Sequence, residues 1–186
     1  MPSISRRRDQ TGGRPAFTPL GSNGSSTTHC SSVRSPRPMS RDHSQPKIHF
    51  RYTPYLDAGV SPRKITIGLA FYGRGWQQVE AGGANGEWQA ANGAAPGQFQ
   101  EEAGTRGYHN LVTSVPNLTV HHDEQSVATY GYTGAGGQWW SFDDSWSIGK
   151  KAAYIKSKNL LGGMIWEMSG DTPNGSLLGT LHSGLD

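Results

Sequence analysis

The segment Lys64–Tyr72 limits most strongly what this chain can fold into. Alternation along it places Ile65, Ile67, Leu69 and Phe71 on one face, and Thr66, Gly68, Ala70 and Tyr72 on the other, with Arg74 following in phase. One face is therefore apolar, and the other is narrow until its end. A strand of a parallel α/β barrel has this pattern, because one face packs on helices while the other points into the barrel.

Residues 141–160 ("SFDDSWSIGKKAAYIKSKNL") predict a helix. Polar residues at its start are N-cap candidates: Asp143, Asp144 and Ser145. Apolar residues recur at i, i+4 and i+7 along it: Ile148, Ala152 and Ile155. We therefore expect this helix to bury one apolar stripe.

Residues 161–168 ("LGGMIWEM") predict a second short strand, in which Met164 and Trp166 share one face and Glu167 lies on the other. The order of elements is then strand, long insertion, helix, strand and final helix. This order gives two βα units, the building unit of a parallel α/β barrel, and two units cannot close a barrel of about eight strands.

Residues 75–137 separate the first strand from the helix. The stretch "EAGGANGEWQAANGAAPGQF" is rich in Gly and Ala, whereas "LTVHHD", "SVATYGY" and "QWWSF" predict short strands. A connection of this length usually carries function or forms a small subdomain. The insertion is therefore expected to carry function or to form a small α+β subdomain.

Ordered structure is expected from Tyr55, where "YLDAGV" predicts the end of a helix with Gly59 just past it. Pro54 and Pro62 bracket this helix, which is therefore expected to be short. The partial barrel is assigned to residues 55–186.

Residues 1–46 differ from the rest in composition. They are rich in Ser, Arg, Pro, Gly and Thr and hold seven arginines against two aspartates, so they account for the basic character of the chain. The segment is predicted to be disordered. A solvated tail without a partner is the preferred interpretation, and contact with RNA or an anionic surface is the alternative. No nucleic-acid partner is expected.

Cys30 is the only cysteine, so no intrachain disulfide can form, and "HC" at residues 29–30 is too little for a metal site. No stretch approaches the roughly 18 apolar residues of a membrane span. The N-terminus carries charges but lacks the apolar segment of a secretory signal. We expect no signal peptide and no membrane partner.

The C-terminal ends of the two strands carry the candidate chemistry. Tyr72 and Arg74 end the first strand, and Trp166 and Glu167 end the second, at the face where α/β barrels form active sites. An indole offers a flat apolar surface to the C–H face of a pyranose, and Arg and Tyr donate hydrogen bonds to sugar oxygens. A core position for Trp166 fits the pattern equally well.

Two of these residues have structural alternatives. Arg74 would serve in an ion pair with a carboxylate of the insertion, such as Glu101 or Asp123. Glu167 is expected to be solvated or ion-paired rather than catalytic, because its side chain alternates away from Trp166.

The two longest motifs are "KITIGLAFYGRGW" and "WWSFDDSWSIGKKAAYIKSKNLLGGMIWEMSGDTPNGSLL", with "YHNL" and "HHDEQSVATYGY" between them. In this order and at this separation they resemble the C-terminal third of glycoside hydrolase family 18 chitinases, especially those with a chitinase insertion domain. The resemblance covers roughly residues 55–186.

The resemblance implies that the two strands are the seventh and eighth of a (β/α)8 TIM barrel and that residues 75–137 are the insertion domain walling the substrate cleft. Trp166 matches the Trp that floors the subsite of the reacting N-acetylglucosamine, and Met164 matches its inward neighbour. Tyr72 and Arg74 match cleft residues that contact the sugar chain. The implied partners are chitin or chito-oligosaccharides. Family members are extracellular and use no cofactor or metal.

These enzymes hydrolyse β-1,4-linked N-acetylglucosamine polymers with retention and substrate assistance. The N-acetyl oxygen attacks the anomeric carbon, while a Glu protonates the leaving oxygen. In the family this Glu lies in an Asp-x-x-Asp-x-Asp-x-Glu motif, which does not occur in this sequence. The chain is therefore expected to be a fragment without the catalytic acid, and no residue is assigned a catalytic role.

Three functions follow, in order of preference. The first is chitin hydrolysis, with this chain an inactive fragment of the enzyme. The second is a non-catalytic, lectin-like chitin-binding protein, which requires a folded scaffold. The third is a nucleic-acid binder acting through residues 1–46, for which binding would depend steeply on salt.

Overall fold

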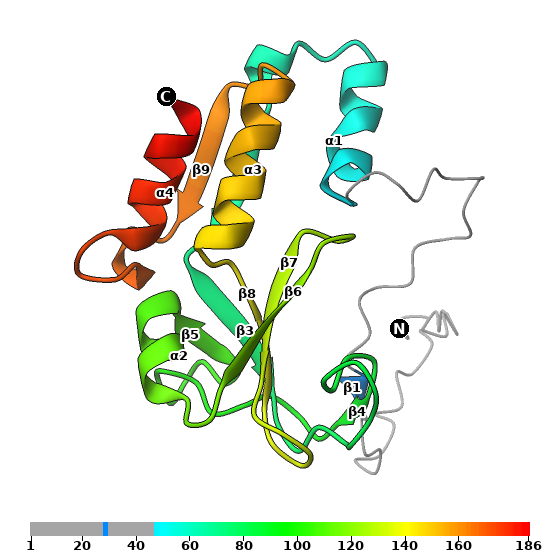
Figure 1. The fold of residues 1–186 in the computed structure, drawn as a ribbon, viewed down its shortest axis with the longest axis vertical. Helices are drawn as coiled ribbons and strands as arrows, with labels where there is room; N and C mark the ends of the chain where they lie inside the picture. Colours follow the sequence, from blue (N-terminus) through cyan, green and yellow to red (C-terminus); the bar gives the residue numbers. More distant parts are fainter. Residues whose placement is uncertain (1–27, 30–46) are drawn as a thin grey trace, which may run out of the picture.

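A computed structural model describes residues 28–29 and 47–186. Its helices are α1 (Lys47–Asp57), α2 (Tyr108–Ser114), α3 (Ser145–Ser157) and α4 (Ser176–Leu185), with 3-10 turns η1 (Pro62–Lys64) and η2 (Met168–Gly170). Its strands are β1 (Thr28–His29), β2 (Thr66–Ala70), β3 (Tyr72–Trp76), β4 (Ala90–Ala91), β5 (Thr105–Gly107), β6 (Thr119–Asp123), β7 (Ala128–Tyr132), β8 (Trp139–Phe142) and β9 (Gly162–Trp166). In Figure 1 the parallel pair β2–β9 and its helices lie above the antiparallel sheet β5-β3-β8-β7-β6.

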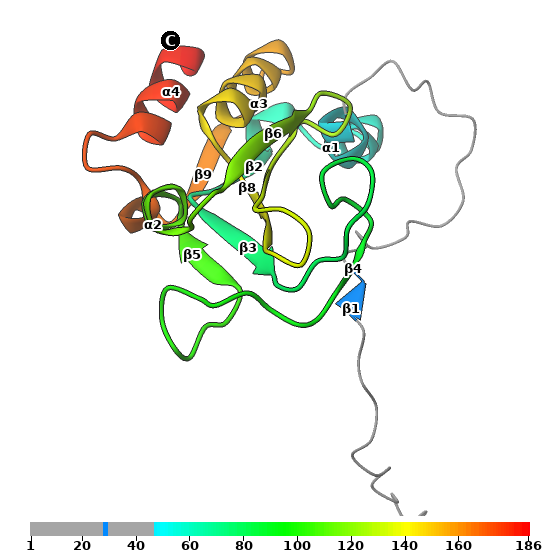
Figure 2. The same cartoon turned by 60° about the horizontal axis from the view of Figure 1, so that its bottom comes forward.

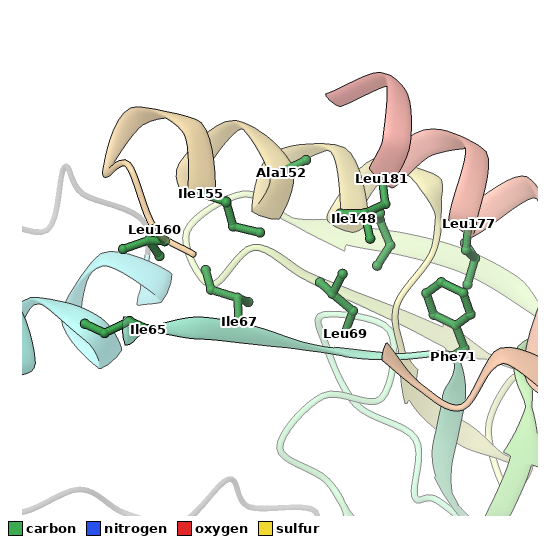
Figure 3. Close-up of a cluster of buried hydrophobic side chains, with 10 residues drawn as sticks. All are labelled: Ile65, Ile67, Leu69, Phe71, Ile148, Ala152, Ile155, Leu160, Leu177 and Leu181. Atoms are coloured by element: carbon green, nitrogen blue, oxygen red, sulfur yellow. The ribbon is translucent and has the colours of Figure 1, made fainter. Parts of the chain in front are cut away.

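The parallel pair packs one face on α3 and α4, as the alternation in the sequence predicts. The buried side chains of this core come from β2 and its flanks, from the two helices and from the residues that lead into β9: Ile65, Ile67, Leu69, Phe71, Ile148, Ala152, Ile155, Leu160, Leu177 and Leu181. Figure 3 shows the strand residues pointing toward the helices. Burial of these apolar side chains is the main force that holds the two βα units together.

Helix α3 begins where the sequence predicts. Asp144 is its N-cap and accepts a hydrogen bond from the Ser147 amide (3.0 Å), while the Ser147 hydroxyl accepts one from the Asp144 amide (3.0 Å). This reciprocal pair is a capping box, which satisfies two amides that the helix itself leaves open.

The predicted strand Lys64–Tyr72 is two strands, which is a correction. β2 ends at Ala70, and β3 begins at Tyr72 in the other sheet. The Phe71 amide donates to the Trp166 carbonyl (2.9 Å), whereas the Phe71 carbonyl accepts from the Tyr108 amide (2.9 Å). Hydrogen-bond partners therefore change at this one residue, and Figure 2 shows β3 leaving the direction of β2.

The predicted short helix bracketed by prolines is also wrong. Helix α1 begins at Lys47 and contains Pro54 in its interior, whereas its end before Gly59, at φ +83°, agrees with the sequence. A proline removes one hydrogen bond from a helix. Packing offsets that loss, because Tyr52 and Leu56 contact the core of the parallel pair.

One face of the five-stranded sheet packs against α2. The buried residues there are Ala95, Leu111, Val115, Trp140 and Phe142. Gly75 lies so close to the Trp140 ring that any side chain at this position would overlap it. The sheet takes in β3 and β8, and so extends beyond residues 75–137 on both sides.

The predicted disordered tail and Cys30 lie outside the described residues, except that Thr28–His29 pair with Ala90–Ala91. Within residues 47–186, no helix has the length and apolar character needed to cross a membrane.

Candidate functional site

The face of the parallel pair opposite the helices carries the candidate site. The register places Gly68 beside Met164 and Ala70 beside Trp166. The side chains of β2 on this face are small, so Met164 (50% exposed) and Trp166 (66% exposed) stand above it. Among the described residues Trp166 is therefore exposed rather than part of the core, and the shared face of Met164 and Trp166 is observed.

The end of β9 is fixed by backbone contacts. The Trp166 carbonyl accepts the Phe71 amide, and η2 follows directly. Gly170 in η2 packs against the Phe71 carbonyl, where an added Cβ would overlap the oxygen. The exposed indole thus rises from a strand end that backbone contacts hold in place.

Tyr72 and Arg74 lie on β3, at the start of the five-stranded sheet. Arg74 is exposed, its Nη1 donates to Thr105 Oγ1 (2.5 Å), and its guanidinium carbon lies 5.5 Å from the centre of the Tyr72 ring. The hydrogen bond joins Arg74 to a hydroxyl of β5 rather than to Glu101 or Asp123. Sequence reasoning did not single out Thr105.

An aromatic row continues from this face across the sheet. Trp76 lies 5.8 Å from Trp139, Trp139 stacks on Tyr130 at 5.4 Å, and Tyr130 stacks on His121 at 5.2 Å. Register places these rings on the face of Tyr72 and Arg74, because Arg74 pairs with Ser141, two residues from Trp139. Alternation within "QWWSF", "ATYGY" and "TVHHD" is the signal that could have revealed the row.

Two adjacent aspartates at the start of α3 are structural. Asp143 is buried, accepts two hydrogen bonds from Lys151 Nζ (2.6 and 2.5 Å), and accepts one from the Ala70 amide (3.2 Å). It therefore anchors the end of β2 to α3. Buried carboxylates are retained in this way only when a cation and hydrogen bonds replace water.

Asp144 has a different set of partners. Partial burial raises the pKa of Asp144, but hydrogen bonds from His122, the Ser147 amide and Thr129 more than offset this, so its pKa lies below the ordinary value. His122 Nε2 is 2.7 Å from the carboxylate, and the His122 ring stacks on Trp146. Asp144 is a charged anchor between β6, β7 and α3, not a proton donor.

Glu167 is exposed, and its Oε1 accepts a hydrogen bond from Ser169 Oγ (2.7 Å). The described part of the chain contains no group of three or more His, Cys, Asp or Glu side chains that could hold a metal ion. The site therefore offers an apolar ring, a thioether and neutral or cationic donors. Such a set suits a ligand with apolar faces and oxygen acceptors.

Comparison with known proteins identifies the family. Residues 19–171 match the family described as Glycosyl hydrolases family 18. The chain is 39% identical over 121 residues to "Chitinase A1" of Niallia circulans, covering 63% of this chain and 17% of that protein. The chain spans about a fifth or less of the length of the first curated relatives. It belongs to glycosyl hydrolase family 18.

Solved structures share the fold. The catalytic domain of the psychrophilic chitinase B from Arthrobacter TAD20 matches with a TM-score of 0.62 at 38% identity, over 72% of this chain and 28% of that one. A mutant of the class V chitinase from Nicotiana tobaccum in complex with NAG4 matches at 0.61 and 27% identity, over 72% and 37%. A chitinase-like agglutinin from Robinia pseudoacacia matches at 0.58 and 27% identity, over 72% and 36%. The mixed α/β fold matches part of family 18 chitinase structures.

Proposed function

We propose that this chain supplies part of the sugar-binding cleft of a chitinase-type glycosidase. The parallel pair β2–β9 would be the last two strands of a (β/α)8 barrel, and the five-stranded sheet would be the chitinase insertion domain. The exposed Trp166 at the C-terminal end of a parallel strand carries the proposal, because an indole held there can stack on a pyranose. Chitin or chito-oligosaccharides are the proposed ligands, outside the cell.

In this proposal the described residues bind and orient the sugar. Trp166 and Met164 would contact the apolar face of an N-acetylglucosamine unit, and Tyr72 and Arg74 would donate to its oxygens. Hydrolysis by substrate assistance needs a Glu that protonates the leaving oxygen. The Asp-x-x-Asp-x-Asp-x-Glu motif that supplies it is absent from this sequence, so the chain alone is expected to bind without cleaving.

Trp166→Ala tests the proposal. We expect binding of tetra-N-acetylchitotetraose, measured by calorimetry, to weaken by about 1–3 kcal/mol, taking stacking of a nucleobase on an aromatic side chain as the nearest magnitude. Trp88→Ala is the matched control, because Trp88 is equally exposed (64%) but lies on the loop between β3 and β4. Equal affinity of wild type and a folded Trp166→Ala variant would remove Trp166 from the site.

A non-catalytic, lectin-like binder is the second candidate, favoured by the match to a chitinase-like agglutinin. The two candidates differ in the full-length protein. Release of reducing ends from chitin by the native protein supports the glycosidase, whereas saturable binding without release supports the lectin. The nucleic-acid alternative rests on residues 1–46, of which the structure describes only Thr28–His29.

A further inference from the structure

A hydrogen bond between Arg74 and Thr105 lies beside the proposed cleft. An arginine on an exposed strand face ordinarily samples many rotamers, and a ligand that binds it must first restrict that freedom. Here the guanidinium is restricted before any ligand arrives. Arg74 Nη1 donates to Thr105 Oγ1 at 2.5 Å, and Arg74 Cζ lies 5.5 Å from the centre of the Tyr72 ring.

The strand register explains why Thr105 can act in this way. Arg74 lies directly opposite Thr105 on β5 and opposite Ser141 on β8, so both hydroxyl-bearing side chains share its face. Of these two hydroxyl groups, Arg74 donates its hydrogen bond to that of Thr105. Thr105 is half-buried and β-branched, which fixes the direction of its hydroxyl.

The residue opposite Tyr72 is Gly107, which brings no side chain of its own to the Tyr72 ring. The Gln98 side chain and the Gly170 backbone lie beside Gly107. Tyr72 is the residue of β3 nearest to Phe71, whose amide is bonded to the Trp166 carbonyl. Holding the guanidinium over Tyr72 therefore turns it back toward the strand end that bears Trp166.

We propose that Thr105 is a positioning residue, which holds the Arg74 guanidinium over Tyr72 so that its remaining N–H groups are presented to oxygen atoms of a sugar bound at Trp166. This inference rests on the proposed function. One donor is used by Thr105, and arginine keeps about four more in a fixed planar geometry. Thr105 touches the arginine and does not itself contact the sugar.

Thr105→Val removes the hydroxyl and keeps the shape, Thr105→Ser keeps the hydroxyl, and Ser141→Ala is the matched control on the opposite neighbour. We expect Thr105→Val to raise the Kd for tetra-N-acetylchitotetraose about three- to tenfold, the cost of ordering one long side chain. Thr105→Ser and Ser141→Ala should leave the Kd within about twofold. The melting temperature should be similar in all three variants.

A double-mutant cycle separates positioning from a general structural effect. In an Arg74→Ala background, Thr105→Val should have no further effect on the Kd, because the group that Thr105 orients is gone. An equal effect of Thr105→Val with and without Arg74 would overturn the inference.

A second measurement needs no ligand. Rotation of the Arg74 guanidinium about its Cζ–Nε bond, followed by NMR exchange of its side-chain nitrogens, should be slow in wild type and Thr105→Ser and faster in Thr105→Val. If wild type binds no chito-oligosaccharide, the proposed function fails, and this measurement still decides the positioning role. Equal rotation rates in wild type and Thr105→Val would overturn that role.

Discussion

The carboxylate of Asp171 determines the local geometry at the start of α4. Asp171 accepts hydrogen bonds from the amides of Thr172 (2.7 Å), Leu177 (3.0 Å) and Leu178 (2.9 Å), and so caps the start of α4 from a position before the N-cap Gly175. Burial raises the pKa of Asp171, but these backbone hydrogen bonds outweigh it, and the pKa lies below its ordinary value of 3.8. The folded protein therefore prefers the ionised form.

Asp171 predicts a loss of stability in acid. A carboxylate with a depressed pKa stabilises the fold fully above its unfolded pKa of 3.8, and this contribution is lost as the pH falls through the lower folded value. Asp171→Asn should therefore lower the melting temperature at about pH 6 and flatten its decline below about pH 4. Asp57→Asn, at an exposed aspartate that ends α1, is the control. Unchanged pH dependence in Asp171→Asn would contradict the assignment.

At the scale of elements, the turn after β9 is wedged between two sheets. A Cβ added to Gly170 would meet both the Phe71 carbonyl and the Gly107 backbone, so η2 packs against the end of β2 and the junction of β5 with α2. The direction of Trp166 thus depends on how tightly η2 packs. A substitution in this turn acts on the site without touching the indole.

Gly170→Ala should therefore be destabilising. The added methyl group would overlap the Phe71 carbonyl, which belongs to the backbone and cannot rotate away. We expect a loss of about 1–3 kcal/mol in the free energy of unfolding, measured with urea. The control is Gly179→Ala on α4, where a Cβ meets nothing within 4 Å. That variant should be neutral or more stable, by up to about 1 kcal/mol. A Gly170→Ala variant as stable as wild type would show that η2 is not tightly packed.

The elements that local pattern determines could be predicted from the sequence. The apolar face of β2 and the capped start of α3 depend on neighbouring residues, and both are observed. The break at Phe71 could not be predicted, because Tyr72 and Arg74 continue the same alternation while the hydrogen-bond partner changes from Trp166 to Tyr108. That change depends on tertiary contacts, which the alternation of side chains along a strand does not reveal.

The candidate site likewise contains some residues that the sequence alone places together and others that only the tertiary structure brings together. Met164 and Trp166 share a face because they are two residues apart, so the sequence alone places them together. Thr105 lies 31 residues from Arg74 in a Gly-rich segment, and only the register of β3 with β5 brings the two together. The short helix predicted after Pro54 was wrong for a related reason, because long-range packing of Tyr52 and Leu56 offsets the local cost of the proline.

At the scale of the whole molecule, the part of the chain that the structure describes covers the parallel pair on one side. Helices α3 and α4 bury one face, whereas the other face exposes Met164 and Trp166. Among the described residues β2 and β9 pair only with each other, which leaves the outer edge of each strand without a partner there. Exposed strand edges and apolar faces favour association between chains.

The isolated chain is therefore expected to self-associate as its concentration rises, seen as an increasing sedimentation coefficient. Met164→Lys places a charge on the exposed face and should shift the association to higher concentration by about tenfold, the effect of about 1.4 kcal/mol. Leu178→Lys, on the partly exposed side of α4, is the control and should have little effect. A chain that stays monomeric at every concentration, or that responds equally to both substitutions, would contradict this prediction.

Phe71, whose amide is bonded to the end of β9 and whose carbonyl is bonded to the first residue of α2, also has an evolutionary consequence. Residues 77–104 leave the sheet after Trp76 and return at Thr105, and within them Gln98 accepts a hydrogen bond from the Gly107 amide beside Gly170. Exchanges around Gly83, where an added side chain would meet nothing within 4 Å, should therefore leave Trp166 in place, whereas exchanges at Gln98 should not. The fold thus joins a strand end held by backbone contacts to a loop that tolerates exchange, and this loop is the part to vary if the sugar preference proposed above is to be changed.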